Sequence, residues 1–183
     1  MIIFDAVSPE NTKITLDIAF QKAAGLSADI VLSTTTGASA AAAMEHAART
    51  GFKGKVIVIT HVWGSKSPGT NRLENREELE AAGAVLVTAA HTLSGAERSL
   101  SNAFGGVYPV EIIAHTLRMF CQGMKVCVEV AAMALDAGAI KEPRPVVAIG
   151  GTGKGLDTAC VITPGYSARI FETRVHESLC KPR

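Results

Sequence analysis

Hydroxyl-bearing residues and a glycine are concentrated in one short segment, residues 34–39, which reads TTTGAS. An alanine-rich stretch follows, so the segment is expected to open a helix. The first helical turn has unpaired backbone N–H groups, and the helix dipole favours negative charge there. We therefore predict an anion site, most simply for a phosphate, formed by Thr34, Thr35, Thr36, Gly37 and Ser39. The alternative is an ordinary cap, in which one hydroxyl caps the helix and the others fill a turn.

A second candidate segment is the glycine-rich turn at residues 150–155, which reads GGTGKG. It is not a Walker A loop, because Ala148 and Gly155 stand where that motif needs Gly and Ser or Thr. It is not a dinucleotide fingerprint either, since Leu156 replaces the third glycine. The turn could still bring backbone N–H groups and a threonine hydroxyl to a ligand, through Gly150, Gly151, Thr152 and Gly153. A plain tight turn is the alternative.

Two histidines, His61 and His91, directly follow predicted strands and could reach the same crevice. With Glu97 or Asp157 they could form an acid–base pair, although ordinary hydrogen-bonding histidines are the favoured interpretation. The five histidines show no HxxxH or HxH spacing, so we predict no metal site. No single residue is predicted to be catalytic.

The elements that would position these residues alternate between strands and helices. Continuous apolar runs predict strands over 30–32, 56–59, 85–87 and 146–149, with two more over 159–163 and 170–175. Helices are predicted from residue 11 or 12 to 24, from 36 to 51, over 71–82 and over 110–137, with stops at Gly25, Gly51, Gly83 and Gly138. Gly123 is a candidate bend in the last helix. Apolar runs without alternation favour a sheet buried on both faces, so we predict a three-layer α/β/α sandwich.

Ligand sites in such sheets form beyond the carboxyl ends of the strands, where the winding direction reverses. The threonine segment, the two histidines and the glycine turn all follow predicted strands, whereas Thr12, a candidate helix cap, is expected to lie away from this crevice. Long loops at 63–70 and 94–108 are candidate lids. Their aromatic residues could cover a flat ring or fill the core; these are Trp63, Phe104 and Tyr108.

Composition narrows the class of protein. The chain has 183 residues, of which 48% are hydrophobic, and a net charge of +1. We expect a single domain over 1–183 that is cytoplasmic, with no nucleic acid partner and no membrane association, because no basic stripe, signal peptide or long apolar stretch is visible. The four cysteines are expected to be buried and reduced; they are Cys121, Cys127, Cys160 and Cys180.

Several stretches resemble a known family. The segment around residues 30–40, the strand at 56–60 and the glycine turn followed by Asp157 and Thr158 are similar to the C-terminal domain of pyruvate kinase, whose Thr/Ser-Gly loop holds a phosphate of a sugar bisphosphate effector. The chain resembles more closely the stand-alone proteins of archaea and bacteria that are similar to this domain. Residues 110–114, 123–129 and 149–153 and the ending CKPR carry that resemblance.

The resemblance implies an α/β/α fold with a mostly parallel sheet and an antiparallel strand near the C-terminus. It also implies that flavin mononucleotide (FMN) can occupy the site. Those effector loops commonly have Arg after the glycine, where this chain has Ala38, which weakens the case for a sugar bisphosphate. Nothing of the pyruvate kinase catalytic barrel is present, so no pyruvate kinase activity is expected.

The first functional hypothesis is an FMN-binding protein, as a candidate flavin-dependent oxidoreductase. The threonine segment would hold the phosphate. The ribityl chain or ring would be lined by His61, Val62, Trp63 and the turn from Gly150 to Gly153, and bounded by Asp157 and Thr158. The alternative is a non-catalytic module that senses a phosphorylated metabolite. We also expect a homo-oligomer, with Glu111, His115 and Arg118 as candidate subunit contacts on one helical stripe.

Overall fold

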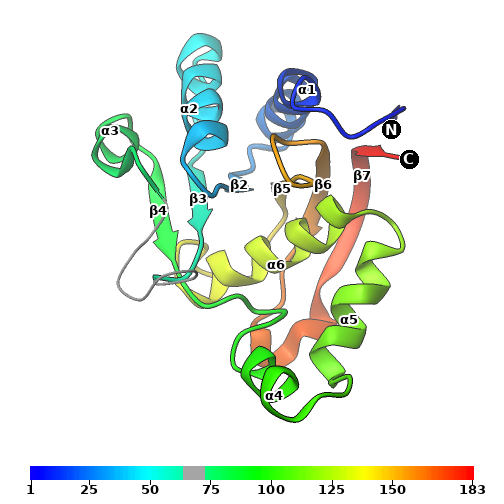
Figure 1. Cartoon of the computed structure of the whole chain (residues 1–183). Coiled ribbons are helices and arrows are strands. Elements are labelled where there is room, and N and C mark those ends of the chain that lie inside the picture. The colour runs from blue at the N-terminus through cyan, green and yellow to red at the C-terminus, as the bar shows by residue number, and fades with distance from the viewer. Residues whose placement is uncertain (64–72) are drawn as a thin grey trace.

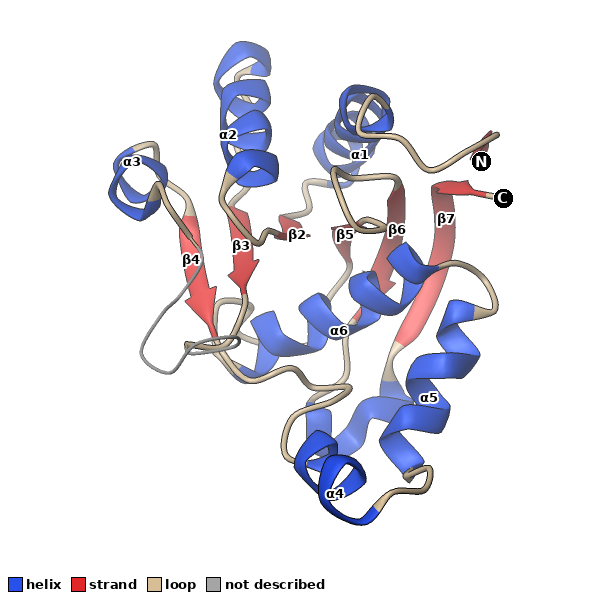
Figure 2. Cartoon of the chain, in the orientation of Figure 1, coloured by secondary structure: helices blue, strands red, loops and turns tan. Residues whose placement is uncertain are grey.

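One central sheet with helices on both faces organises the part of the chain that the structure describes (Figures 1 and 2). The structure is a computed structural model and describes residues 1–63 and 73–183. In spatial order, the strands of the sheet are β1 (Ile2–Phe4), β7 (Arg174–Pro182), β6 (Thr158–Thr163), β5 (Val146–Gly150), β2 (Ile30–Ser33), β3 (Val56–Thr60) and β4 (Val85–Thr88). The helices are α1 (Asn11–Leu26), α2 (Ala38–Thr50), α3 (Arg76–Ala81), α4 (Glu97–Phe104), α5 (Pro109–Arg118), α6 (Gln122–Asp136) and the 3₁₀ helix η1 (Ser167–Glu172).

The sheet is mixed but mostly parallel. Among the described strands only β6 runs in the opposite direction, and it is antiparallel to both of its neighbours, β5 and β7. The predicted three-layer fold with an antiparallel strand near the C-terminus is therefore confirmed. The two ends of the chain lie side by side, because β1 pairs with the last residues of β7 (Figure 1).

Each face of the sheet has its own apolar core. Alternate residues of a strand point to opposite faces. In β2, Ile30 and Leu32 pack in the core beneath α1 and α2, whereas Val31 packs in the core beneath α6. All three are 0% exposed. A strand between two helical layers must be apolar at every position, which explains the unbroken apolar runs in the sequence.

The predicted helix boundaries hold near the N-terminus with small differences. Helix α2 ends at Thr50, and the predicted stop Gly51 follows it with a left-handed φ of 65°, which suits a glycine at a helix end. Helix α1 continues past Gly25 to Leu26, and Ser27 takes the left-handed position with φ of 49°. Helix α3 is shorter than predicted and begins at Arg76. The first two residues of that prediction, 71 and 72, lie outside the described residues.

The prediction of one helix over 110–137 is wrong, because two helices, α5 and α6, occupy this stretch. The break falls at residues 119–121, where the Cys121 thiol accepts the Met124 N–H and caps α6. Gly123 does not bend the helix. A Cβ at position 123 would lie 2.0 Å from Thr158 Oγ1, so this glycine allows α6 to pack closely on β6.

Three other predictions need correction. The first half of the predicted strand over 170–175 belongs to η1, and β7 begins at Arg174. The predicted loop over 94–108 contains α4. Strand β1 was not expected, because it has only three residues and depends on pairing with the distant β7.

The four cysteines are free and buried, as predicted. Burial raises the pKa of the Cys127 thiol well above its ordinary value, which favours the neutral thiol. Within residues 1–63 and 73–183, no helix has the length and apolar character needed to cross a membrane.

Candidate functional site

A cleft of about 960 Å³ opens at the carboxyl ends of the parallel strands. Its walls come from the loops that follow β2, β3, β4 and β5, and from α4, α5 and α6. The chain winds outward from β2 to β4 and returns to place β5 on the other side of β2, so the cleft lies where the winding direction reverses. Seven predicted site residues line it, namely Thr34, Thr35, Thr36, Ser39, His61, Gly151 and Gly153.

The threonine loop, residues 34–37, presents the start of α2 to this cleft. Gly37 occupies the N-cap position, and no side chain caps the helix. The Thr34 hydroxyl, which is buried, accepts the Gly37 N–H at 3.1 Å and so fixes the loop. Among the described residues, the Thr34 hydroxyl closes the turn before α2, and no side chain accepts an N–H group of the first helical turn. Those N–H groups are therefore candidate donors to an anion. The half-buried hydroxyls of Thr35 and Ser39 lie on the cleft wall beside them.

Gly37 is required at its position for two reasons. Its φ of 105° lies in a region that residues with a Cβ rarely adopt. In addition, a Cβ at this position would lie 1.7 Å from Asn75 Oδ1. The Glu74 N–H donates to the Thr36 carbonyl at 3.1 Å, so the segment before α3 supports the threonine loop from behind. Asn75 was not predicted as a site residue, because nothing in its local sequence pattern links it to residue 37.

Asp157 and Thr158 hold the glycine turn in place from behind the cleft. Asp157 is 1% exposed; its Oδ2 accepts the Thr152 N–H at 3.1 Å and its Oδ1 accepts the Thr158 hydroxyl at 2.7 Å. Its own N–H donates to the Gly150 carbonyl. Neither Asp157 nor Thr158 is among the cleft-lining residues, in contrast to the expectation that they would bound the ligand. Their role in the structure is to shape the turn.

Thr12 was expected to lie away from the crevice, and this prediction is wrong. Its side chain lines the cleft, and its Oγ1 accepts the Leu156 N–H at 3.0 Å. A Cβ at Gly155 would lie 2.6 Å from that same oxygen. The start of α1 therefore packs against the glycine turn.

Three polar side chains form a hydrogen-bonded series across the cleft. Thr35 Oγ1 lies 3.1 Å from His61 Nε2, and His61 Nδ1 lies 3.1 Å from His91 Nε2. The two imidazole centroids are 4.9 Å apart. Burial, and after it the nearby cations Lys125 and Arg98, lower the pKa of His91.

Neither predicted carboxylate partner takes part in this series. Glu97 Oε1 accepts the Val110 N–H at 3.3 Å, and Asp157 binds the glycine turn. The carboxylate that acts on His91 is Glu129, which opposes the lowering of its pKa.

Positive charge gathers at the floor of the cleft. Lys125 and Glu129 form a buried ion pair with Nζ and Oε2 2.5 Å apart, and Glu129 Oε1 accepts the Leu93 N–H at 3.0 Å. Desolvation by burial lowers the pKa of Lys125, against the opposing effect of Glu129. Arg98 from α4 and Arg118 from α5 line the same region, so cations outnumber the one carboxylate there.

These residues could have been found from the sequence only in part. Lys125 and Glu129 stand four apart in an otherwise apolar helix, which is the signal of a buried pair. The stripe of Glu111, His115 and Arg118 stays a predicted subunit contact, and two of its members also make contacts within the chain. Glu111 accepts the N–H of Tyr108 at the start of α5, whereas Arg118 reaches the cleft and binds Gln122.

The remaining predicted residues lie outside the cleft lining. Gly37, Gly150 and Thr152 support the two loops, while Val62 and Trp63 are exposed, Trp63 by 59%. Phe104 is 78% exposed and neither it nor Tyr108 lines the cleft. Most of the predicted lid at 63–70 falls on residues outside those described. Within the described residues no cluster of three or more His, Cys, Asp or Glu side chains is arranged to hold a metal ion.

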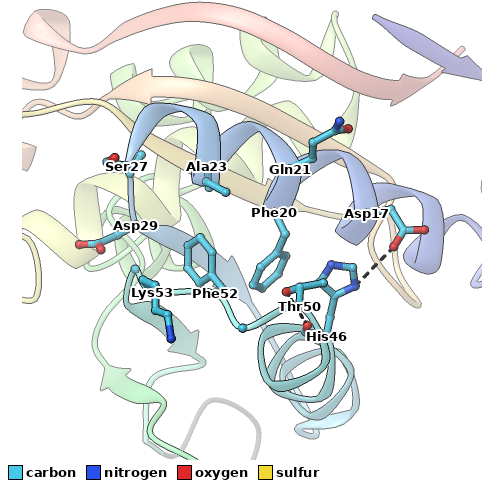
Figure 3. A pocket seen from close by; sticks show the side chains of 14 residues that line it. Asp17, Phe20, Gln21, Ala23, Ser27, Asp29, His46, Thr50, Phe52 and Lys53 are labelled. Atoms are coloured by element: carbon cyan, nitrogen blue, oxygen red, sulfur yellow. Dashed lines mark hydrogen bonds and ion pairs between the residues drawn. The ribbon is translucent and has the colours of Figure 1, made fainter.

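A second cavity, of about 680 Å³, lies between the C-terminal halves of α1 and α2 (Figure 3). Its floor is aromatic: the Phe20 ring centroid lies 5.0 Å from that of Phe52 and 4.7 Å from that of His46. Two of its polar side chains are paired within the protein: Asp29 binds the Lys55 N–H and Arg144, and His46 binds Arg49. The cleft at the carboxyl ends of the strands gathers more cations, since Arg98, Arg118 and Lys125 line it, and it is therefore the better candidate for anion recognition.

The fold and the site together define a doubly wound α/β domain with a cation-rich cleft at the switch point of its sheet. The family model of the pyruvate kinase alpha/beta domain matches residues 15–162 of this chain. The chain therefore belongs to that family. The matched region contains the threonine loop, both histidines, the buried ion pair and the glycine turn.

Proposed function

We propose that this chain binds a phosphate-bearing ligand in the cleft, with FMN as the first candidate. The observation that carries the proposal is the start of α2, which no side chain of the described residues caps and which opens onto a cleft whose floor carries Lys125, Arg98 and Arg118. A helix N-terminus attracts an anion, and nearby cations strengthen that attraction.

The chemistry of the donors fits a single terminal phosphate. The N–H groups of the first turn of α2 and the hydroxyls of Thr35 and Ser39 are neutral donors on the cleft wall. Ala38 supplies no guanidinium, so the loop itself lacks the bidentate hydrogen bonds with which an arginine could bind a second phosphate. One hydrogen bond to a charged acceptor contributes about 1.5–3 kcal/mol.

The rest of the cleft fits the remainder of FMN by size and polarity. Its volume of about 960 Å³ lies within the range of drug-sized ligand sites. The Thr152 hydroxyl in the glycine turn is buried and has no hydrogen-bond partner among the described residues. It is a candidate partner for a ribityl hydroxyl, if the turn adjusts on binding. When bound, the flavin ring would supply redox chemistry, and the chain would hold, orient and shield it.

The test is the identity of the small molecule that copurifies with the protein. We expect a visible flavin spectrum, and FMN by mass spectrometry after denaturation. A colourless protein that also gives no thermal shift with added FMN would contradict the cofactor assignment.

A non-catalytic sensor of a phosphorylated metabolite is the second candidate. Large apolar side chains outside the cleft favour it, because they offer surface for assembly: Met119 is 83% exposed, Phe120 61% and Phe171 80%. In this case the protein would form a homo-oligomer whose size depends on ligand. Light scattering with and without FMN, together with flavin reduction by NADH, separates the two. Ligand-dependent assembly without redox turnover favours the sensor.

A further inference from the structure

Two histidines in direct hydrogen-bond contact connect the threonine loop with the charged floor of the cleft. His61 lies between Thr35 and His91, with 3.1 Å at each contact. His61 follows β3 and His91 follows β4, and these strands pair in register, so the sheet itself brings the imidazoles together. Neither histidine is needed merely to fill space, since both are only half-buried.

The direction of this series depends on what binds the threonine loop. Each contact contains one hydrogen, and the Thr35 hydroxyl has only one to donate. When an anion accepts that hydrogen, His61 Nε2 must carry a hydrogen and donate it to Thr35 Oγ1. A neutral His61 then has a bare Nδ1, which must accept the hydrogen on His91 Nε2. Each hydrogen in the series is thus donated in the direction of the anion, and His91 Nδ1 is the nitrogen that can take up a further proton.

We propose that anion binding at the threonine loop draws a proton onto the His61–His91 pair, so that the site prefers a doubly charged anion and binds it more tightly as the pH falls. This inference rests on the proposed function, because it concerns the same anion site.

The charges around the pair support this coupling. His91 faces Lys125 and Glu129 from α6, Arg98 from α4, and His61 from the end of β3. Burial lowers the pKa of His91 in the free protein, Glu129 raises it, and Lys125 and Arg98 lower it further. Free His91 is therefore biased toward the neutral form near pH 7. A bound dianion brings compensating negative charge into the cleft, which raises the pKa of His91.

Sulfate is the probe that tests this inference, because its charge stays at two over the relevant pH range while a phosphate monoester itself titrates. The measurements are sulfate affinity from pH 5.5 to 8.5 and the pKa of each histidine by NMR of the ring Cε1–H, with and without sulfate. We expect the pKa of His91 to rise by about one unit on binding, which corresponds to about tenfold tighter binding at low pH.

His91→Gln supplies the matched variant, since its amide retains an N–H donor toward His61 but cannot take up a proton. It should lose most of the tightening of sulfate binding that the wild type shows between pH 8.5 and pH 5.5. His115→Gln, on the exposed side of α5, should keep the full pH dependence. The NMR titration of the wild type decides the matter even if His91→Gln folds poorly.

The outcomes separate the two proposals. Sulfate that binds with the same affinity at all pH values, or an unchanged pH dependence in His91→Gln, would overturn the proton coupling and leave the anion site intact. Absence of sulfate and FMN binding at every pH would overturn both.

Discussion

Substitution of Gly37 by alanine should destabilise the fold through two separable effects. The φ of 105° would hold a residue with a Cβ in a sparsely populated region, at a cost of about 1–3 kcal/mol. The new methyl would also overlap Asn75 Oδ1, which lies 1.7 Å from the Cβ position, and overpacking costs about 1–3 kcal/mol. We therefore expect Gly37→Ala to lower the free energy of unfolding by about 2–6 kcal/mol.

Urea unfolding of a small set of variants measures this loss of stability and separates the contribution of the overlap from that of the backbone strain. Adding Asn75→Ala to Gly37→Ala removes the overlap but not the backbone strain, so about 1–3 kcal/mol should return. The matched control is Gly25→Ala in α1, where nothing lies within 4 Å of the Cβ position. There the same change should stabilise the protein by about 0.5–1 kcal/mol, because alanine favours a helix. A Gly37→Ala protein within about 0.5 kcal/mol of the wild type would refute the reasoning.

Three further predictions follow from the cleft and its charges. Ser39→Ala removes one hydroxyl donor at the start of α2 and should weaken FMN binding by about 10- to 150-fold in isothermal titration, with the fold intact; an unchanged affinity would remove Ser39 from the site. Lys125→Met leaves Glu129 buried without its partner and should cost about 3–5 kcal/mol in urea unfolding, whereas the pair Lys125→Met with Glu129→Gln should recover most of it. The free energy of unfolding should fall as the pH drops below about 6.5, because burial lowers the pKa of His46 and His91 and the unfolded chain then binds protons more readily. Urea unfolding at several pH values measures this dependence, and His91→Gln should make it weaker. A protein that becomes more stable as the pH falls would contradict the assigned pKa shifts.

The layers of the fold were predictable because they depend on local patterns. The apolar runs of β2, β3, β4 and β5 have strand length and no alternation, which follows from burial on both faces. The stop of α2 at Gly51 was predictable from its residue type alone. Strand β1 and the long β7 were not, because their pairing joins the two ends of the chain, and no local pattern records a contact of that separation.

The break between α5 and α6 shows why helix boundaries inside a periodic segment are hard to predict. Residues 119–121 contain neither proline nor glycine, and the cap is a cysteine thiol, which is an uncommon capping group. Gly123 was predicted to bend the helix, but in the structure it allows close packing against Thr158.

The candidate site was predictable where its residues follow strands directly. This covers the threonine loop, His61 and the glycine turn, which the sheet brings to one edge. Asn75 and the pair of Lys125 and Glu129 come from helices and from a distant loop, so only the tertiary arrangement shows that they belong there. The expected FMN ligand stays a prediction, since the chemistry of the cleft supports a phosphate more specifically than it supports a ring.

A comparison of FMN with riboflavin tests the central claim most directly, because the two ligands differ only in the phosphate. Isothermal titration should show FMN binding at least about 100-fold more tightly than riboflavin, since two or more hydrogen bonds to the phosphate would be lost. Ser39→Ala should narrow that difference without changing riboflavin binding. If riboflavin binds as tightly as FMN, or if Ser39→Ala weakens both equally, the start of α2 is not a phosphate site.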